Sequence, residues 1–326
     1  MAGHQRIVSL ISSATEILFL LELGERVVGV SHECDFPPAV AALPRLTRAR
    51  IVASASSRAI DQQVRELSAT SAALYEIDVD RLAALKPDLI ITQAQCDVCA
   101  VRYEDVVSAV QATPALAVAE ILALNPHSLS EVLDDIERVA RAVRDDAVAR
   151  RGAALKAEKV EFLAQRQCQA AAIPSGEVPR VICLEWIDPP MVAANWTPEL
   201  VAWSGGQPGL SRAGAHSTYA DWQQIVDYDP QVLVIMPCGF DLDRAIDEAQ
   251  VLSRFAGWHA LSAVRCGRVY AVDGNAYFNR SGPRLIDSLE ILGQLVQPRY
   301  FPRPIDERAA RAWRRMDTRG AALVAV

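Results

Sequence analysis

The sequence has no strongly basic patch, no phosphate-binding motif and no uninterrupted apolar run long enough to cross a bilayer. Its 326 residues include 40 acidic and 33 basic side chains, which gives a net charge of −7 at pH 7. Nucleic-acid-binding proteins normally present a basic stripe, so this balance argues against one. A transmembrane helix needs about 20 consecutive apolar residues, and the apolar stretch at residues 14–23 is interrupted by Glu16 and Glu22.

The N-terminus also lacks the pattern of a secretory signal peptide. Such a peptide has a charged start, an apolar core and a small-residue cleavage site, whereas this chain enters a strand-like run at once. We therefore expect a cytoplasmic protein. In a reducing compartment, an odd set of cysteines indicates metal binding, reactivity or burial more than disulfides. The seven cysteines stand at positions 34, 96, 99, 168, 183, 238 and 266.

Strand-like and helix-like segments alternate along the chain. This alternation predicts an α/β protein with a mostly parallel sheet whose strands are buried on both faces. The strands are expected at residues 6–10, 26–31 and 89–92, and the helices at residues 12–23 and 79–85.

A weak internal repeat indicates two lobes. LAALKPDLIITQAQC, from residue 82, matches IVDYDPQVLVIMPC, from residue 225, in pattern: a helix end, a proline turn, a buried strand and a cysteine. RIVSL at residue 6 and RVICL at residue 180 match as opening strands. Each half therefore presents cysteine after an equivalent strand, at the sheet edge where ligands of open α/β sheets bind.

The stretch between the halves has apolar residues at helical spacing, and Ser128 or Ser130 is a suitable N-cap. Only Gly152 interrupts it, so one long helix is expected to span both lobes. The predicted organisation is an N-terminal α/β lobe (1–126), a long connecting helix (127–173), a C-terminal α/β lobe (174–299) and a C-terminal helical tail (300–326).

Three stretches together resemble a known family. They are RIVSLISSATEILFLLELGERVVGVSHECDFPP from residue 6, LAALKPDLIIT from residue 82 and GNAYFNRSGPRLIDSLEILGQL from residue 274. They resemble the helical-backbone (class III, TroA-like) solute-binding proteins of ABC importers, most closely the cobalamin-binding branch and its relatives without a signal peptide. The resemblance covers about residues 6–296. It implies two Rossmann-like lobes, with mostly parallel sheets, joined by one long α-helix, and a ligand held in the cleft between them.

The resemblance also implies ligand contacts. Phe278 and Arg280 match residues that contact the ligand in the family, although Arg280 is equally suited to a structural salt bridge. Where the family has its aromatic cradle, this chain has Glu33, Leu74, Gln93 and, approximately, Ser217. Trp186 and Trp196 would supply the apolar surface that a corrinoid needs. The predicted ligand-binding set is Ser13, Glu33, Cys34, Gln93, Trp186, Trp196, Phe278 and Arg280.

Four cysteines follow strands that face the predicted cleft. Cys96 and Cys99 form a C-x2-C pair, Cys238 occupies the mirrored position of the second lobe, and Cys34 follows the second strand. Four thiolates would suit zinc or an iron–sulfur cluster. A single thiolate would suit the axial position of corrinoid cobalt, and simple packing of small buried side chains is the third interpretation.

We therefore expect a non-catalytic protein that binds cobalamin, a related corrinoid or another metal-containing ligand between its lobes. The alternative is a metalloprotein in which Cys34, Cys96, Cys99 and Cys238 hold an iron–sulfur cluster or zinc, with redox or catalytic work at the site. A third interpretation is a scaffold that binds a partner protein. Importer docking in the family uses one acidic residue on each lobe; Asp80 matches the first, but the chain near Trp222 is not acidic, so docking is not expected.

Overall fold

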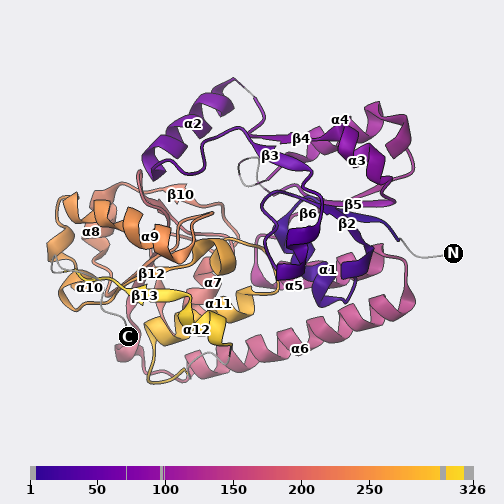
Figure 1. The fold of residues 1–326 in the computed structure, drawn as a ribbon. Coiled ribbons are helices and arrows are strands. Elements are labelled where there is room, and N and C mark those ends of the chain that lie inside the picture. Colours follow the sequence, from indigo (N-terminus) through magenta and orange to yellow (C-terminus); the bar gives the residue numbers. More distant parts are fainter. Residues whose placement is uncertain (1–4, 71, 96–97, 99, 302–305, 319–326) are drawn as a thin grey trace.

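The computed structural model describes residues 5–70, 72–95, 98, 100–301 and 306–318. Figure 1 shows two α/β lobes side by side, with one long helix running beneath both. The N-terminal lobe has a four-stranded parallel sheet in the order β2-β1-β5-β6, which confirms the predicted parallel arrangement. Its strands are β1 (Ile7–Ser9), β2 (Val27–Val30), β5 (Leu89–Gln93) and β6 (Glu120–Leu124), and its helices include α1 (Ser12–Leu20), α3 (Val79–Leu85) and α4 (Tyr103–Ala112).

A second, two-stranded element belongs to the N-terminal lobe. β3 (Thr47–Ala49) pairs antiparallel with β4 (Tyr75–Ile77). The chain between them carries α2 (Ser57–Ala69), which lies over the other lobe in Figure 1.

The C-terminal lobe has a mixed sheet in the order β10-β8-β7-β11-β12-β13, with β9 beside β7. The central strands β7, β11 and β12 are parallel, while β8, β10 and β13 run antiparallel to their neighbours. The strands are β7 (Arg180–Trp186), β8 (Met191–Val192), β9 (Gln207–Pro208), β10 (Thr218–Tyr219), β11 (Val232–Ile235), β12 (Val269–Val272) and β13 (Trp313–Arg315). The helices are α7 (Thr197–Trp203), α8 (Trp222–Tyr228), α9 (Leu242–Ala249), α10 (Ser262–Arg265), α11 (Leu285–Val296) and α12 (Glu307–Arg311).

The predicted internal repeat has a structural basis. α3 and α8 both end at a residue with a positive φ, Lys86 at 47° and Asp229 at 49°, and a proline follows each. A proline disfavours helical geometry at the residue before it, so both helices end at the same place in the repeat. The strands that follow, β5 and β11, lie parallel beside β1 and β7 respectively. The two halves therefore share one α–turn–β unit.

The connecting segment at residues 127–173 differs from the single helix that was predicted. It forms two helices, α5 (Leu129–Ala142) and α6 (Asp146–Ala171). Arg144 adopts a positive φ of 56° between them, and the Asp145 side chain then accepts hydrogen bonds from the first turn of α6. A positive φ does not fit a right-handed helix, and aspartate is a preferred N-cap, so the chain stops and restarts here.

α6 alone is the long helix that joins the lobes. Its 26 residues correspond to about 39 Å at 1.5 Å per residue. Near its start Arg151 pairs with Glu22 of the N-terminal lobe, and near its end Arg166 pairs with Glu290 of α11. Of the helices that the structure describes, none is both long and apolar enough for a bilayer span.

The described residues 306–318 of the C-terminal tail do not form the single helix that was predicted. After the short α12, the chain forms β13, which adds an antiparallel edge strand to β12. Trp313 in this strand packs edge-on against Tyr270 of β12, with ring centroids 5.7 Å apart. Aromatic cross-strand pairs stabilise sheets. Residues 306–318 of the tail are therefore part of the C-terminal lobe rather than an appended helix.

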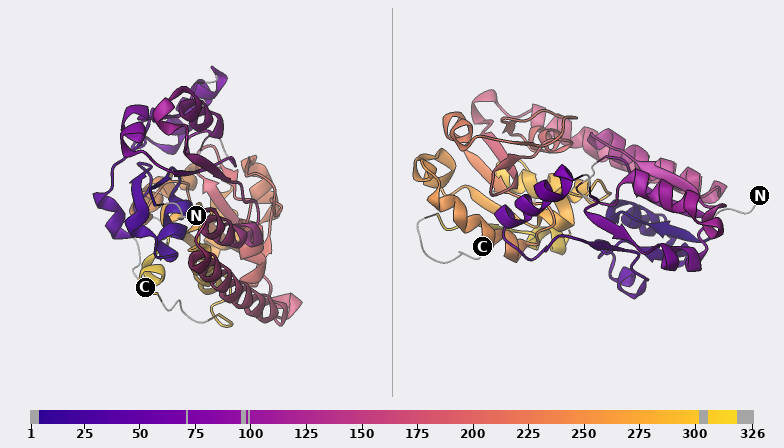
Figure 2. Two further views of the ribbon diagram at one scale, coloured as in Figure 1. Left: turned by 90° about the vertical axis from the view of Figure 1, so that its right-hand side faces the viewer. Right: turned by 90° about the horizontal axis from the view of Figure 1, so that it is seen from above.

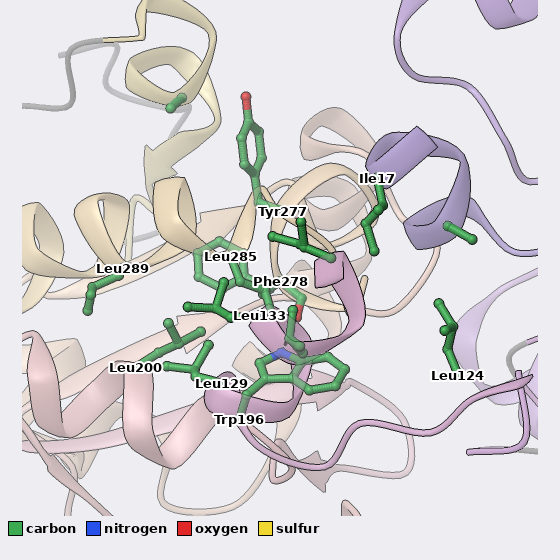
Figure 3. Packing of buried hydrophobic residues seen from close by; sticks show 14 of the residues in the cluster. Ile17, Leu124, Leu129, Leu133, Trp196, Leu200, Tyr277, Phe278, Leu285 and Leu289 are labelled. Atoms are coloured by element: carbon green, nitrogen blue, oxygen red, sulfur yellow. Dashed lines mark hydrogen bonds between the residues drawn. The ribbon is translucent and has the colours of Figure 1, made fainter. Parts of the chain in front are cut away.

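One cluster of buried side chains is shared by the two lobes. It includes Ile17 of α1 and Leu133 of α5 from the N-terminal side, and Leu200 of α7 from the C-terminal side. Figure 3 shows Trp196 and Phe278 together with Leu133 at the centre of this cluster. Since separating the lobes would expose these side chains to water, the hydrophobic effect limits their relative motion.

A buried acid on α5 gives a prediction about pH and stability. Asp135 is 1% exposed, Arg138 donates to its Oδ1 at 2.6 Å, and its Oδ2 has no partner among the described residues. Burial raises the pKa of Asp135 from 3.8 to about 6. Because the folded state holds the proton more tightly than the unfolded state, the unfolding free energy falls as pH rises from about 4 to 6.

Asp135→Asn should therefore be more stable than the native chain at pH 7, by about 1–3 kcal/mol. Denaturant unfolding at pH 5 and pH 7 would measure this, and the gain should shrink at the lower pH. Asp134→Asn, at a neighbouring half-exposed acid, is the matched control and should give no gain. A less stable Asp135→Asn protein at pH 7 would contradict the assignment.

Candidate functional site

Loops that follow strands of the two sheets meet along one boundary, which we call the lobe junction. Hydrogen bonds cross it between Asn275 and Asp35 at 3.0 Å and between Ser281 and Ser13 at 3.3 Å. Ligands of α/β sheets bind at the carboxyl ends of the strands, and the junction brings such ends from both lobes together. It comprises residues 11–16 and 31–35 of the N-terminal lobe and residues 185–188, 236–240 and 273–284 of the C-terminal lobe.

A network of buried charges closes one side of the lobe junction. Arg280 donates to both carboxylate oxygens of Asp35, at 2.6 and 2.8 Å, and to Glu16 at 3.3 Å. Arg284 donates to both oxygens of Glu16, at 2.9 and 2.6 Å. The Arg280 and Glu16 side chains are only 8% and 3% exposed. Both terminal nitrogens of Arg280 are thus engaged within the protein, in the salt-bridge role that the sequence left open.

Two carboxylates of the junction, Asp35 and Glu33, have lowered pKa values and are therefore held in their ionised form. Burial alone would raise the pKa of Asp35, but the hydrogen bonds and charge of Arg280 outweigh burial and lower it. The pKa of Glu33 is lowered chiefly by its contact with His32, whose Nε2 lies 3.1 Å from the carboxylate. His32 is oriented through its Nδ1, which lies 2.7 Å from the Thr47 hydroxyl. These carboxylates lie close to the guanidinium group of Arg280, so this part of the junction carries charges of both signs.

Two of the three predicted aromatic ligand contacts are packing residues in this structure. Phe278 is fully buried and Trp196 is 5% exposed; the Trp196 indole donates to the Phe278 carbonyl at 2.9 Å. Trp186 is only partly buried, at the end of β7. Its ring packs edge-on against Phe240, and its indole donates to the carbonyl of Ser57 in α2 at 3.2 Å. Of the three, Trp186 is the one that retains exposed surface at the junction.

The predicted polar contacts Ser13 and Gln93 lie deep in the N-terminal lobe. Ser13 is 1% exposed, and its hydroxyl accepts a hydrogen bond from the Ser281 hydroxyl across the junction. Gln93 is 2% exposed, at the end of β5. Its amide donates to the Val101 carbonyl at 3.3 Å, and its oxygen accepts from the Gln95 amide at 2.7 Å. Ser13 thus stabilises the junction and Gln93 the loop that follows β5, and their contact with a ligand stays a prediction.

The structure does not support Cys34 as a metal ligand. Cys34 is fully buried in the shared core, and the Thr15 hydroxyl lies 3.1 Å from its sulfur. Burial raises the pKa of this thiol, whereas metals bind the thiolate. Cys238 is partly exposed just beyond β11, at the predicted position. Cys96 and Cys99 lie outside the described residues, and within those residues no group of three or more ligand side chains is arranged to hold a metal ion.

Comparison with known families agrees with this architecture. The sequence matches the family model described as "Periplasmic binding protein" over residues 7–276. The chain belongs to this family. The match spans both lobes and the helices between them.

Two curated members of the family align with nearly the whole chain. The ABC transporter substrate-binding lipoprotein YvrC of Bacillus subtilis is 26% identical over 304 residues, which are 91% of this chain and 81% of that protein. The vitamin B12-binding protein of Vibrio cholerae is 22% identical over 298 residues, which are 88% of this chain and 87% of that protein.

Solved structures of the family show the same fold. The periplasmic vitamin B12-binding protein BtuF of Vibrio cholerae has a TM-score of 0.63 at 21% identity, covering 91% of this chain and 98% of that one. A periplasmic heme-binding protein from Pseudomonas aeruginosa has a TM-score of 0.68 at 18% identity, covering 93% and 95% of the two chains. At these identities the likeness establishes the arrangement of the lobes and leaves the ligand open.

Several junction residues were not identified from the sequence. Glu16 was read only as an interruption of an apolar stretch, and Asp35, Asn275 and Arg284 were not considered. A charged residue within an apolar helix such as α1 is an available signal, because a buried carboxylate needs a partner. Its partners Arg280 and Arg284, 264 and 268 positions away in the sequence, could be found only from the fold.

Proposed function

We propose that this chain is a non-catalytic binding protein that holds a corrinoid, such as cobalamin, at the lobe junction. The observation that carries the proposal is the junction itself, where strand ends of two α/β lobes meet around the network of Arg280, Asp35 and Glu16. Relatives with this arrangement are named for binding vitamin B12 or heme. The ligand class therefore includes metal-containing tetrapyrroles.

The charge of the junction favours a corrinoid over heme. Heme carries two carboxylates, whereas the edge of a corrinoid carries neutral amides that can donate hydrogen bonds. Glu33 is held ionised at the junction, and its carboxylate would repel anions and accept hydrogen bonds from amides. Arg280, the cation best placed for a carboxylate, is already neutralised by Asp35 and Glu16. Trp186 would supply an apolar face for the ring.

An absorbance titration tests this proposal. Cyanocobalamin should produce a saturable spectral change with one ligand per chain and a dissociation constant of about 10 µM or lower, while heme should bind at least about tenfold more weakly. Glu33→Ala should weaken cobalamin binding by about tenfold. Glu158→Ala, at an exposed position of α6, is the matched control and should bind normally. Absence of any spectral change at about 100 µM cobalamin, or preferential binding of heme, would refute the corrinoid assignment.

The iron–sulfur or zinc alternative is distinguished by metal analysis of freshly isolated protein. Iron with acid-labile sulfide, or zinc, in an amount equal to the protein would favour the cysteine site, and Cys238→Ser would then remove it. Docking to an importer through paired carboxylates is not part of the proposal. Asp80 lies in the first turn of α3, but Trp222 begins the equivalent helix α8.

A further inference from the structure

Residues 51–70, which we call the strap, leave the N-terminal lobe between two strands that belong to it. β3 and β4 pair with Thr47 opposite Ile77. The Leu46 amide, just before β3, donates to the Val30 carbonyl of β2 at 2.9 Å. The chain between β3 and β4 nevertheless extends over the C-terminal lobe, and the views in Figures 1 and 2 agree on this. The strap therefore connects the lobes a second time, apart from α6.

Polar contacts fasten the start of α2 to the C-terminal lobe. The Ser57 amide and hydroxyl both donate to Glu248 of α9, at 2.7 and 2.6 Å. Arg58 donates to both oxygens of Asp188, at 2.9 Å each. The Trp186 indole donates to the Ser57 carbonyl at 3.2 Å. The strap is thus joined directly to the end of β7, through the Trp186 side chain that we assign to the ligand, and to Asp188 just beyond it.

The apolar contacts of the strap are also with the C-terminal lobe. Ile60 is 7% exposed and belongs to the same buried cluster as Leu184 and Phe240, and Val64 packs against that cluster. Within the part of the chain that the structure describes, the side-chain hydrogen bonds that join the strap to distant residues all reach the C-terminal lobe. The strap is covalently part of one lobe and packed on the other.

This attachment is shallow compared with the rest of the junction. Only Ser57 and Ile60 of α2 are buried, and the Arg58 side chain is 75% exposed. The side chain of its partner Asp188 is 11% exposed, so this ion pair is open to solvent on the arginine side. Segments with few buried contacts open at a lower free energy than the core around them. The Arg280–Glu16 side of the junction, by contrast, is buried and continuous with the shared core.

We propose that the strap is a releasable gate, which detaches from the C-terminal lobe to admit and release the ligand while the lobes stay fixed. The proposal rests on the proposed function for the identity of the ligand, but detachment is a property of the chain alone. Weakening the strap should therefore change the rates of ligand exchange and leave the affinity nearly unchanged, because a gate that is closed in both the free and the bound protein favours neither.

Hydrogen exchange on the ligand-free protein tests detachment. Amides of α2 should exchange at least about 100-fold faster than those of α5, and Ile60→Ala should accelerate α2 by about a further tenfold without changing α5. Arg58→Ala, which removes the ion pair with Asp188 (side chain 11% exposed), should act in the same direction. Arg141→Ala, which removes an exposed pair on α5, is the control and should leave α2 unchanged. Equal exchange rates in α2 and α5 would show that the strap opens only on global unfolding and would overturn the proposal.

Stopped-flow mixing with cyanocobalamin tests gating. In Ile60→Ala the association and dissociation rates should both rise by about tenfold, with the dissociation constant within about twofold of the native value. A rise in the dissociation rate alone would indicate that the strap contacts the ligand. Unchanged rates would indicate that the strap stays attached during ligand exchange. Either result would contradict the gate. Should cobalamin fail to bind, the proposed function fails, and the hydrogen-exchange result still decides whether the strap detaches.

Discussion

Glu16→Ala is expected to lower the free energy of unfolding by about 3–5 kcal/mol, because it leaves buried charges without a partner. Glu16 is the shared acceptor of Arg280 and Arg284 and is 3% exposed. After the substitution, Arg284 loses both of its carboxylate contacts. The only carboxylate partner left to Arg280 among the described residues is then Asp35, whose side chain is 54% exposed. Denaturant unfolding monitored by circular dichroism measures the loss.

The matched control for Glu16→Ala is Glu76→Ala. Glu76 also pairs with two arginines, Arg48 and Arg50, but these arginine side chains are 78% and 41% exposed. Because these partners are open to solvent, removal of the Glu76 carboxylate should cost much less than Glu16→Ala. If both substitutions cost the same small amount, the network at the lobe junction is not a buried ion-pair system.

Trp196→Ala is expected to cost about 3–5 kcal/mol of stability, as truncation of a large buried aromatic side chain does. The indole lies in the core that the lobes share, beside Phe278 and Leu133 in Figure 3. Removing it leaves a cavity between the lobes and an unsatisfied Phe278 carbonyl. Thermal or denaturant unfolding of the ligand-free protein measures this loss.

Trp196→Phe separates packing from hydrogen bonding. It keeps most of the apolar volume but removes the indole donor, so it should cost about 1–3 kcal/mol. Trp186→Ala, at a partly exposed ring of the same junction, should cost less than Trp196→Ala and should weaken ligand binding more. Native stability in Trp196→Ala together with lost binding would instead make Trp196 a ligand contact, as the sequence first indicated.

The strands of the sheets were predictable because their apolar sequence pattern agrees with their burial in the structure. Leu89, Ile90 and Ile91 are all buried, and they alternate between two core clusters on the two faces of the sheet. Such a strand gives a continuous apolar run in the sequence. The paired proline turns after α3 and α8 were equally visible, since they depend on residues that are adjacent in the chain.

The helix break and the tail were not predictable in this way. Gly152 looked like the interruption of the connecting helix, yet it lies inside α6, where a Cβ would come 2.4 Å from the Ala140 Cβ. A glycine is needed there because α5 and α6 pack closely at this point, and this contact between two helices is set by the tertiary structure. The real break, at Arg144 and Asp145, has only an N-cap residue as its signal. β13 forms because it pairs antiparallel with the edge of β12. The sequence of the tail alone does not reveal this pairing.

The candidate site was predicted in location more than in detail. Strand ends of both lobes meet as the resemblance implied, and Arg280 lies at their junction. Arg280, Trp196 and Cys34 are buried there because distant residues complete their environments: Asp35, Phe278 and Thr15. A sequence shows that such side chains lie near a strand end. It does not show which of them are already engaged by other residues of the protein and which are free to contact a ligand. The cytoplasmic location stays a prediction.

Hydrogen exchange with and without cyanocobalamin tests the central claim most directly, because it locates the bound ligand. Saturating ligand should slow amide exchange on both sides of the lobe junction, at residues 31–35 and at residues 236–240, and leave the middle of α6 unchanged. Protection confined to one lobe, or to a surface away from the junction, would contradict a ligand held between the two sheets.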